Sequence, residues 1–207
     1  MKKTISVRKI LQALYYIQRK APADNQSRFS RVYLLKMIFA ADRYHLRHFG
    51  FMATDDNYFA MKLGPVASAT YNILKHSLGG INSAEMFYLS AVKEISEHDV
   101  VIEEQGEDEL SESFKEAIDF ALREFGHYNW EQISSISHCY PEWKKHESAL
   151  AVLETNKRIE MSVRDFFDDP SDEGCFAKFD KDGDPFKEDK DFLALLKSDY
   201  DAHTISA

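Results

Sequence analysis

Residues 32–41, "VYLLKMIFAA", constrain the fold of this chain more than any other stretch. If they form a helix, apolar side chains lie on nearly every side of it. Such a helix must be covered by other elements, because none of its faces suits water. We therefore predict a central buried helix over residues 31–48, with Gly50 as its C-terminal stop.

Helical patterns on both sides of this segment supply elements that can cover it. Ser6 can cap a helix over residues 7–20, in which apolar side chains share one face. Ser113 and Glu116 form a capping-box pattern before a helix that ends at Gly126. Asn129 can cap a further helix, and we expect its apolar residues to face inward: Trp130, Ile133 and Ile136.

The remaining segments predict a little β structure and a distinct C-terminus. Residues 86–104 partly alternate aromatic and β-branched side chains, which indicates two short strands. Beyond Asp168 the chain is acidic and rich in Gly, Pro and Asp, so we expect a loosely packed tail without which the core folds. The fold class is mainly α: a single compact helical domain (1–167) with a small antiparallel β-hairpin or sheet, plus an acidic C-terminal extension (168–207).

The net charge of −9 over 207 residues hides an asymmetry. Residues 1–80 hold 13 Lys and Arg against 4 Asp and Glu (+9), and residues 81–207 hold 13 against 31 (−18). This split fits halves that pack on each other, a charged face that meets a protein partner, or a basic half that binds nucleic acid. We favour the first two, because aromatic residues of buried character dilute the basic half.

Other features favour a cytoplasmic protein. The two cysteines, Cys139 and Cys175, are too few for a disulfide framework, which fits a reducing compartment. The basic start is followed by a stretch that Arg8 and Lys9 interrupt, so no signal peptide is predicted. No segment approaches the roughly 20 apolar residues of a membrane span.

A Gly-Pro step in residues 57–75, "NYFAMKLGPVASATYNILK", is the most distinctive local motif. Pro65 suits the first position of a third helix, where free N–H groups near Lys62 could hold an anion. Phosphate-binding loops use several glycines, however, and Gly64 stands alone. We interpret Gly64-Pro65 as a rigid corner, with Lys62 on the rim that faces a partner.

Two blocks of the sequence resemble a known family. The first, "LLKMIFAADRYHLRHFGFMATDDNYFAMKLGPVASATYNILK", contains Asp42, Gly50, Gly64 and Pro65, and the second, "GHYNWEQISSISHCYPEWKK", contains His138 and Trp143. Together they resemble the Panacea domain of the SocA-like antitoxins, which include phage-associated proteins, over residues 7–167.

The resemblance implies a bacterial, phage or mobile-element protein that binds and neutralises a cognate toxin protein, as one half of a toxin–antitoxin system. It implies no catalytic residue, cofactor or metal, and it gives Asp42, Gly50, Gly64, Pro65, His138 and Trp143 structural roles. Interface hot spots are rich in Arg and aromatic residues. We therefore expect these partner contacts: Tyr44, Arg47, Tyr58 and Lys62.

Rival functions rest on weaker patterns. A nucleic-acid-binding regulator would use the basic half, but no ordered recognition motif is present. A hydrolase would use Cys139 beside His138, or a metal held by Asp42, His45 and His48, which share adjoining parts of one helix face. The run Asp180, Asp182, Asp184 begins like a calcium loop but has Pro185 at the glycine position.

Overall fold

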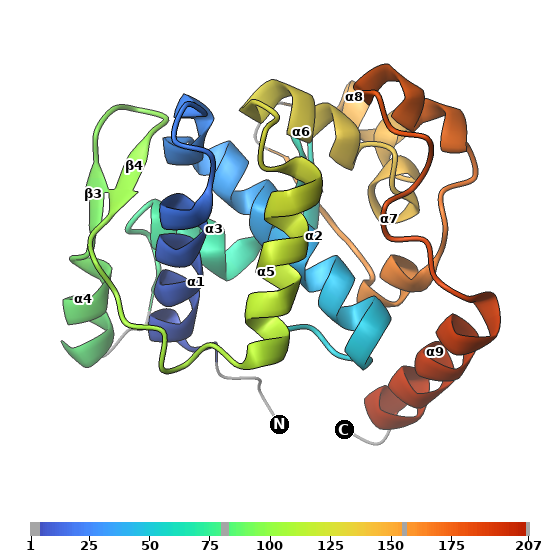
Figure 1. Ribbon diagram of the computed structural model, residues 1–207, viewed down its shortest axis with the longest axis horizontal. Coiled ribbons are helices and arrows are strands. Elements are labelled where there is room, and N and C mark those ends of the chain that lie inside the picture. Colours follow the sequence, from blue (N-terminus) through green and yellow to red (C-terminus); the bar gives the residue numbers. More distant parts are fainter. Residues whose placement is uncertain (1–4, 80–82, 155–156, 206–207) are drawn as a thin grey trace.

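The computed structural model describes residues 5–79, 83–154 and 157–205, and its centre is helix α2, Arg31–Phe49 (Figure 1). The side chains of α2 are buried on all sides, as the sequence predicts. Helices α1 (Val7–Lys20), α5 (Glu112–Phe125) and α6 (Trp130–Ser137) pack against it. Gly50 ends α2 with φ +82° and donates its N–H to Leu46 O at 2.9 Å.

The helix starts follow the capping rules, with one correction. Ser6 Oγ caps α1 by accepting from Lys9 N, and the side chains of Asn129 and Gln132 form a capping box at the start of α6. The predicted cap of α5 is wrong by two residues: Ser111 Oγ, not Ser113 Oγ, accepts from Phe114 N at 3.1 Å.

Two small antiparallel sheets complete the predicted fold class. Strands β1 (Tyr58–Met61), β2 (Gly64–Ala67) and β5 (Ile159–Glu160) form one sheet in the order β2-β1-β5. Strands β3 (Val92–Glu94) and β4 (Val100–Ile102) form the predicted hairpin, although part of its predicted first strand is helix α4 (Ser83–Leu89).

Pro65 lies in a strand, which corrects the prediction that it begins a helix. It pairs with Ala60 on the edge strand β2, where its missing N–H removes no ladder bond. Helix α3 begins later and spans Ser68–Leu74. Its first free N–H groups, those of Ala69 and Thr70, donate to the Asp56 carboxylate at 2.8 Å each, a cap that is distant in sequence.

The rest of the chain runs through short elements to a last helix. These are η1 (Gln26–Phe29), α7 (Pro141–Lys144), α8 (Glu147–Val152), η2 (Val163–Phe167), η3 (Glu173–Phe179) and α9 (Lys190–Ile205). Helix α9 lies at the opposite end of the molecule from the β3–β4 hairpin (Figure 1). Within the described residues, no helix combines the length and apolar character needed to cross a membrane.

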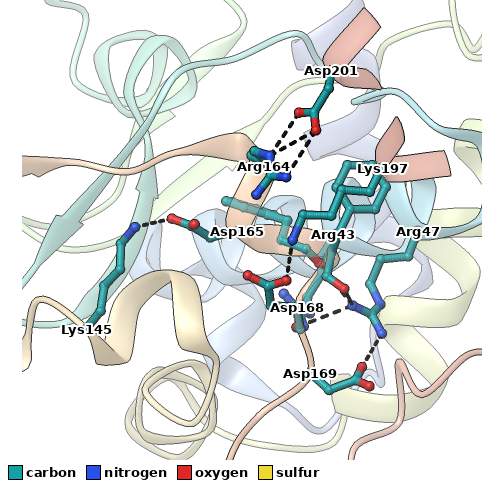
Figure 2. A network of polar contacts seen from close by, with 11 residues as sticks. Arg43, Arg47, Lys145, Arg164, Asp165, Asp168, Asp169, Lys197 and Asp201 are labelled. Atoms are coloured by element: carbon teal, nitrogen blue, oxygen red, sulfur yellow. Dashed lines mark hydrogen bonds and ion pairs between the residues drawn. The ribbon is translucent and has the colours of Figure 1, made fainter. Parts of the chain in front are cut away.

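The C-terminal extension is packed into the core, which corrects the expectation of a loose tail. Phe176, Phe186 and Leu193 are buried. The buried Arg47 donates to Phe167 O (2.7 Å) and Phe186 O (3.1 Å) and pairs with Asp169 (2.6 Å). Figure 2 shows Arg43 and Arg47 reaching toward Asp168 and Asp169, which lie just after η2. The division of the chain at residue 167 stays a prediction.

The charge asymmetry is explained by contacts between the two halves. Cations from residues 5–79 pair with carboxylates from later in the chain: Arg8 with Asp108 and Glu109, Arg19 with Glu107, Lys20 with Asp119, Arg31 with Glu94, Arg43 with Glu142, and Arg47 with Asp169. Much of the positive charge of the basic half is therefore paired with carboxylates of the same molecule.

Candidate partner-binding surface

The Gly-Pro motif forms one side of a two-residue hairpin turn. Met61 pairs with Gly64 across β1 and β2, so only Lys62 and Leu63 connect the strands. Both side chains are exposed, and 48% of Leu63 is accessible to solvent. The turn therefore presents one cationic and one large apolar side chain.

Side chains from three helices hold the carbonyl groups around this turn. Ser134 Oγ of α6 donates to Leu63 O at 2.7 Å, and Trp143 Nε1 of α7 donates to Met61 O at 2.9 Å. Lys36 Nζ, from the middle of α2, donates to Pro65 O at 2.7 Å. Because the backbone is bonded on both strands, the turn is held in one position relative to the core.

Gly64 is required by both its conformation and its neighbours. Its φ of +99° lies in the region that side chains with a Cβ rarely adopt. A Cβ at this position would collide with Ser137 Oγ and lie 2.9 Å from Lys36 Cε. The motif thus forms a tight turn between two strands, not a corner at the start of a helix, and the role of Gly64-Pro65 as a rigid corner stays a prediction.

Two ionisable side chains lie beneath the turn, the fully buried Lys36 and the half-buried His138, and burial disfavours the charged form of each. Burial lowers the pKa of Lys36 to about 7 and that of His138 to about 4. The His138 ring stacks on Trp143 with centroids 3.6 Å apart. His138 Nε2 has no hydrogen-bond partner among the described residues, and the structural role of His138 stays a prediction.

A groove of about 370 Å³ lies beside the turn. Its apolar lining comes from α2, α3, α6 and the turn: Val32, Leu35, Leu63, Tyr71 and Trp130. Trp130 is 37% exposed, which corrects the expectation that it points inward. The groove and the turn together form what we call the turn surface, defined by Val32, Leu35, Lys62, Leu63, Tyr71, Lys75 and Trp130.

The rim of the turn surface is built partly by the loop of the β3–β4 hairpin. Arg31, at the first position of α2, joins the two elements: its guanidinium donates to Glu97 O and, at 3.0 Å, to Leu74 O. The backbone N–H of Arg31 donates to His98 O at 3.0 Å. Glu97, His98 and Asp99 therefore form the far edge of the groove.

Two lysines on the turn surface have no ionic partner among the residues that the structure describes. Lys62 and Lys75 are both exposed, and neither pairs with a carboxylate in the part of the chain that the structure describes. Their charge is available to an outside partner, unlike that of Arg31, which pairs with Glu94.

Three of the four predicted partner contacts are buried. Tyr44 donates to Glu116 at 2.7 Å, Tyr58 donates to Asp42 at 2.7 Å, and Arg47 holds the C-terminal extension. A buried side chain cannot contact a partner, so of the predicted set only Lys62 lies on an open surface. Leu63 and Trp130, which line the groove, were not in the predicted set, and Trp130 fell in a periodic apolar pattern that usually marks core. The sequence signal for the exposure of Leu63 was its position next to a turn glycine.

The residues of the rival metal site have separate partners. Asp42 accepts from Thr54 N (2.9 Å) and from Tyr58 Oη, and burial raises its pKa to about 6. His45 Nδ1 bonds to Phe51 O at 2.8 Å, whereas His48 Nε2 pairs with Glu188 at 2.7 Å. Within the described ranges, no group of His, Cys, Asp and Glu side chains is arranged to hold a metal ion.

Cys139 is joined to Cys175 by a disulfide, so the two cysteines, too few for a framework, form one bridge. A bridged sulfur is not a free nucleophile. The hydrolase hypothesis built on Cys139 beside His138 therefore lacks its reactive group in this structure.

Comparison with protein families gives a match to part of the chain. The model of the SocA-like antitoxins, described as "Antitoxin SocA-like, Panacea domain", matches residues 34–144. The matched region contains α2, the turn, Trp130 and Trp143. Comparisons with curated proteins and with solved structures returned no match.

Proposed function

The chain belongs to the SocA-like antitoxin family with a Panacea domain, and from this premise we propose that it neutralises a cognate toxin protein by binding it directly. The turn surface is the proposed contact. Neutralisation is by occlusion: the bound antitoxin covers the working surface of the toxin, and no chemical step is required.

The observation that carries this proposal is the fixed presentation of Leu63 next to Trp130. Rigid apolar and aromatic side chains bind well, because little conformational freedom is lost on association. Lys62 and Lys75 add positive charge that pairs with no carboxylate among the described residues. The turn surface therefore suits a toxin that offers an apolar side chain to the groove and carboxylates to the two lysines.

The alternative function, a nucleic-acid-binding regulator, receives less support. Duplex and single-strand binders track phosphates with many exposed cations. Here Arg31, Arg43 and Arg47 are buried and paired within the fold. The charge asymmetry that suggested this function is better explained by the packing of the two halves.

We propose further that the protein has no enzymatic activity, acts in the cytoplasm, and belongs to a bacterium or a phage. Support for the absence of catalysis comes from the family and from the bonded state of the candidate groups, Cys139 and Asp42.

Growth rescue tests the proposal with a matched pair of variants. The toxin encoded by the neighbouring gene is expressed with wild-type protein, with Leu63→Asp, or with Leu195→Asp. Leu195 on α9 is similarly exposed (59%) and lies outside the turn surface. We expect wild type and Leu195→Asp to restore growth and Leu63→Asp to fail at equal protein levels. Equal rescue by both variants would refute the turn surface as the contact.

A further inference from the structure

The disulfide joins two parts of the chain that meet only through folding. Cys139 lies between α6 and α7, inside the region that matches the family, and Cys175 lies in η3 of the C-terminal extension. The residues are 36 positions apart, and their Cα atoms are separated by 6.1 Å, a usual distance for a bridge. The bridge therefore ties the extension covalently to the family domain.

Both bridged residues line an open cavity. It measures about 430 Å³, and its walls include Ser135, His138, Lys144, Ser171 and Lys178 beside the two cysteines. Cys139 and Cys175 are each half-buried. A cavity of this size next to an accessible disulfide admits a small thiol of peptide size to the sulfur atoms.

Among the described residues, few other contacts hold the segment just before Cys175. Ser171 and Asp172 are exposed, and Asp172 bonds locally, accepting from Gly174 N at 2.9 Å. The next fixed points are Phe176, whose ring lies 5.5 Å from that of Tyr140, and Phe179, whose carbonyl accepts from Tyr128 Oη. Before this segment, Pro170 is buried and Asp169 pairs with Arg47. The bridge therefore lies between two anchored points of the chain, Pro170 and Phe176.

We propose that the Cys139–Cys175 bridge is a thiol–disulfide exchange site, at which a small-molecule thiol opens a clasp between η3 and the family domain. This proposal concerns a different part of the molecule from the turn surface and does not depend on the proposed function. The same cavity serves both directions of the exchange.

The exchange is balanced with two molecules of the thiol. The thiolate sulfur of the first bonds to one cysteine sulfur, the protein S–S bond breaks, and the other cysteine leaves as a thiolate and takes up a proton. A second thiolate attacks the mixed disulfide and releases the oxidised small molecule. The protein then holds two thiols, and an oxidised small-molecule disulfide reverses the sequence.

Lysine charge at the cavity favours the thiolate that leaves. Lys178, three residues after Cys175, pairs with no carboxylate among the described residues, whereas Lys144 pairs with Glu147 at 2.8 Å. A nearby cation stabilises a cysteine thiolate. His138 does not add charge, because burial lowers its pKa to about 4.

Native-state reduction of the full chain tests access to the bridge. The oxidised protein is mixed with reduced glutathione, quenched with N-ethylmaleimide, and its thiols are counted by intact mass. We expect a rate within about 100-fold of that of the urea-unfolded chain. A slower rate of reduction, or two thiols that stay free after treatment with oxidised glutathione, would overturn the proposal.

The variant Ser171→Trp narrows the mouth of the cavity and should slow reduction of the bridge roughly tenfold in the folded chain only. An unchanged rate would exclude the cavity as the route by which the thiol reaches the bridge.

Hydrogen exchange tests the clasp on the wild-type chain, so no variant has to fold. Amides of residues 174–179 should exchange about tenfold faster after reduction, while those of α2 stay protected. If these amides exchanged at equal rates in the oxidised and the reduced protein, the bridge would not restrain this segment and the proposal would be wrong. Toxin binding is not a readout of either experiment, so failure here is separate from failure of the proposed function.

Discussion

Ser134 on α6 donates its hydroxyl hydrogen to the carbonyl oxygen of Leu63, 2.7 Å away across 71 residues of sequence. This bond joins the helix that carries Trp130 to the turn that carries Leu63. The two exposed apolar side chains of the turn surface are thereby held in a fixed relation, which is what a preformed contact site requires.

Removing this hydroxyl should loosen the turn. Ser134→Ala leaves Leu63 O without its partner, and we expect a loss of about 1 kcal/mol in the free energy of unfolding together with weaker toxin binding. The matched control is Ser135→Ala, whose hydroxyl donates within α6 to Glu131 O. Urea unfolding measures the free energy of unfolding, and a binding titration measures the affinity for the toxin. If Ser134→Ala and Ser135→Ala gave equal values in both, the Ser134 bond would not hold the turn.

Substitutions in the Gly-Pro motif should separate conformation from contact. Gly64→Val places a β-branched side chain at φ +99° and against Ser137 and Lys36, so we expect a loss of about 2 kcal/mol or more. Pro65→Ala should cost less than about 1 kcal/mol, because Pro65 restricts the unfolded chain and donates no ladder bond. Thermal melts decide the order, and a Gly64→Val protein as stable as wild type contradicts the packing described.

Lys36 should make stability depend on pH. Its pKa is about 7 in the folded chain, against 10.5 for an unburied lysine, because burial disfavours the charged form. Between these values the unfolded chain binds one more proton than the folded chain, so the free energy of unfolding rises with pH across the window. Below pH 7 both states are protonated and the slope vanishes.

We expect wild type to gain up to about 1.4 kcal/mol per pH unit relative to Lys36→Met between pH 7 and 10. Urea unfolding at several pH values measures this difference, with Lys75→Met controlling for the loss of a surface charge. If the difference in free energy of unfolding between wild type and Lys36→Met did not change with pH, Lys36 would be charged in the folded protein.

Truncation after Phe167 should destabilise the domain, contrary to the expectation from composition alone. Removing the extension exposes the sites filled by Phe176 and Phe186, and core losses of this kind cost about 3–5 kcal/mol each. It also takes away Asp169, the carboxylate that pairs with the buried Arg47. Circular dichroism melts test this: a truncated chain that melts like wild type would restore the picture of an independent tail.

The sequence predicted elements whose signals are local. The α1 cap at Ser6, the capping box at Asn129 and the stop at Gly50 each lie within a few residues of the helix they define. The burial of α2 followed from its apolar character on all sides, and the family resemblance was confirmed over residues 34–144.

The sequence could not show contacts between distant residues. Arg47 looked like a surface contact because its acceptors lie about 120 positions later in the chain. The extension looked loose because its carboxylate Asp169 meets Arg47 only in the fold. Pro65 carried a helix-start signal, but pairing with β1 placed it in a strand. The turn surface depends on Ser134, Trp143 and Lys36 holding three carbonyls, which no spacing reveals.

Oxidative footprinting of the complex tests the central claim most directly. The antitoxin is exposed to hydroxyl radicals with and without its toxin, and modification of Leu63, Trp130 and Leu195 is read by mass spectrometry. We expect modification of Leu63 and Trp130 to fall at least about fivefold in the complex while Leu195 reacts as before, because an interface core excludes water. Protection of Leu195 with Leu63 and Trp130 still reactive would contradict the turn surface as the site where the toxin binds.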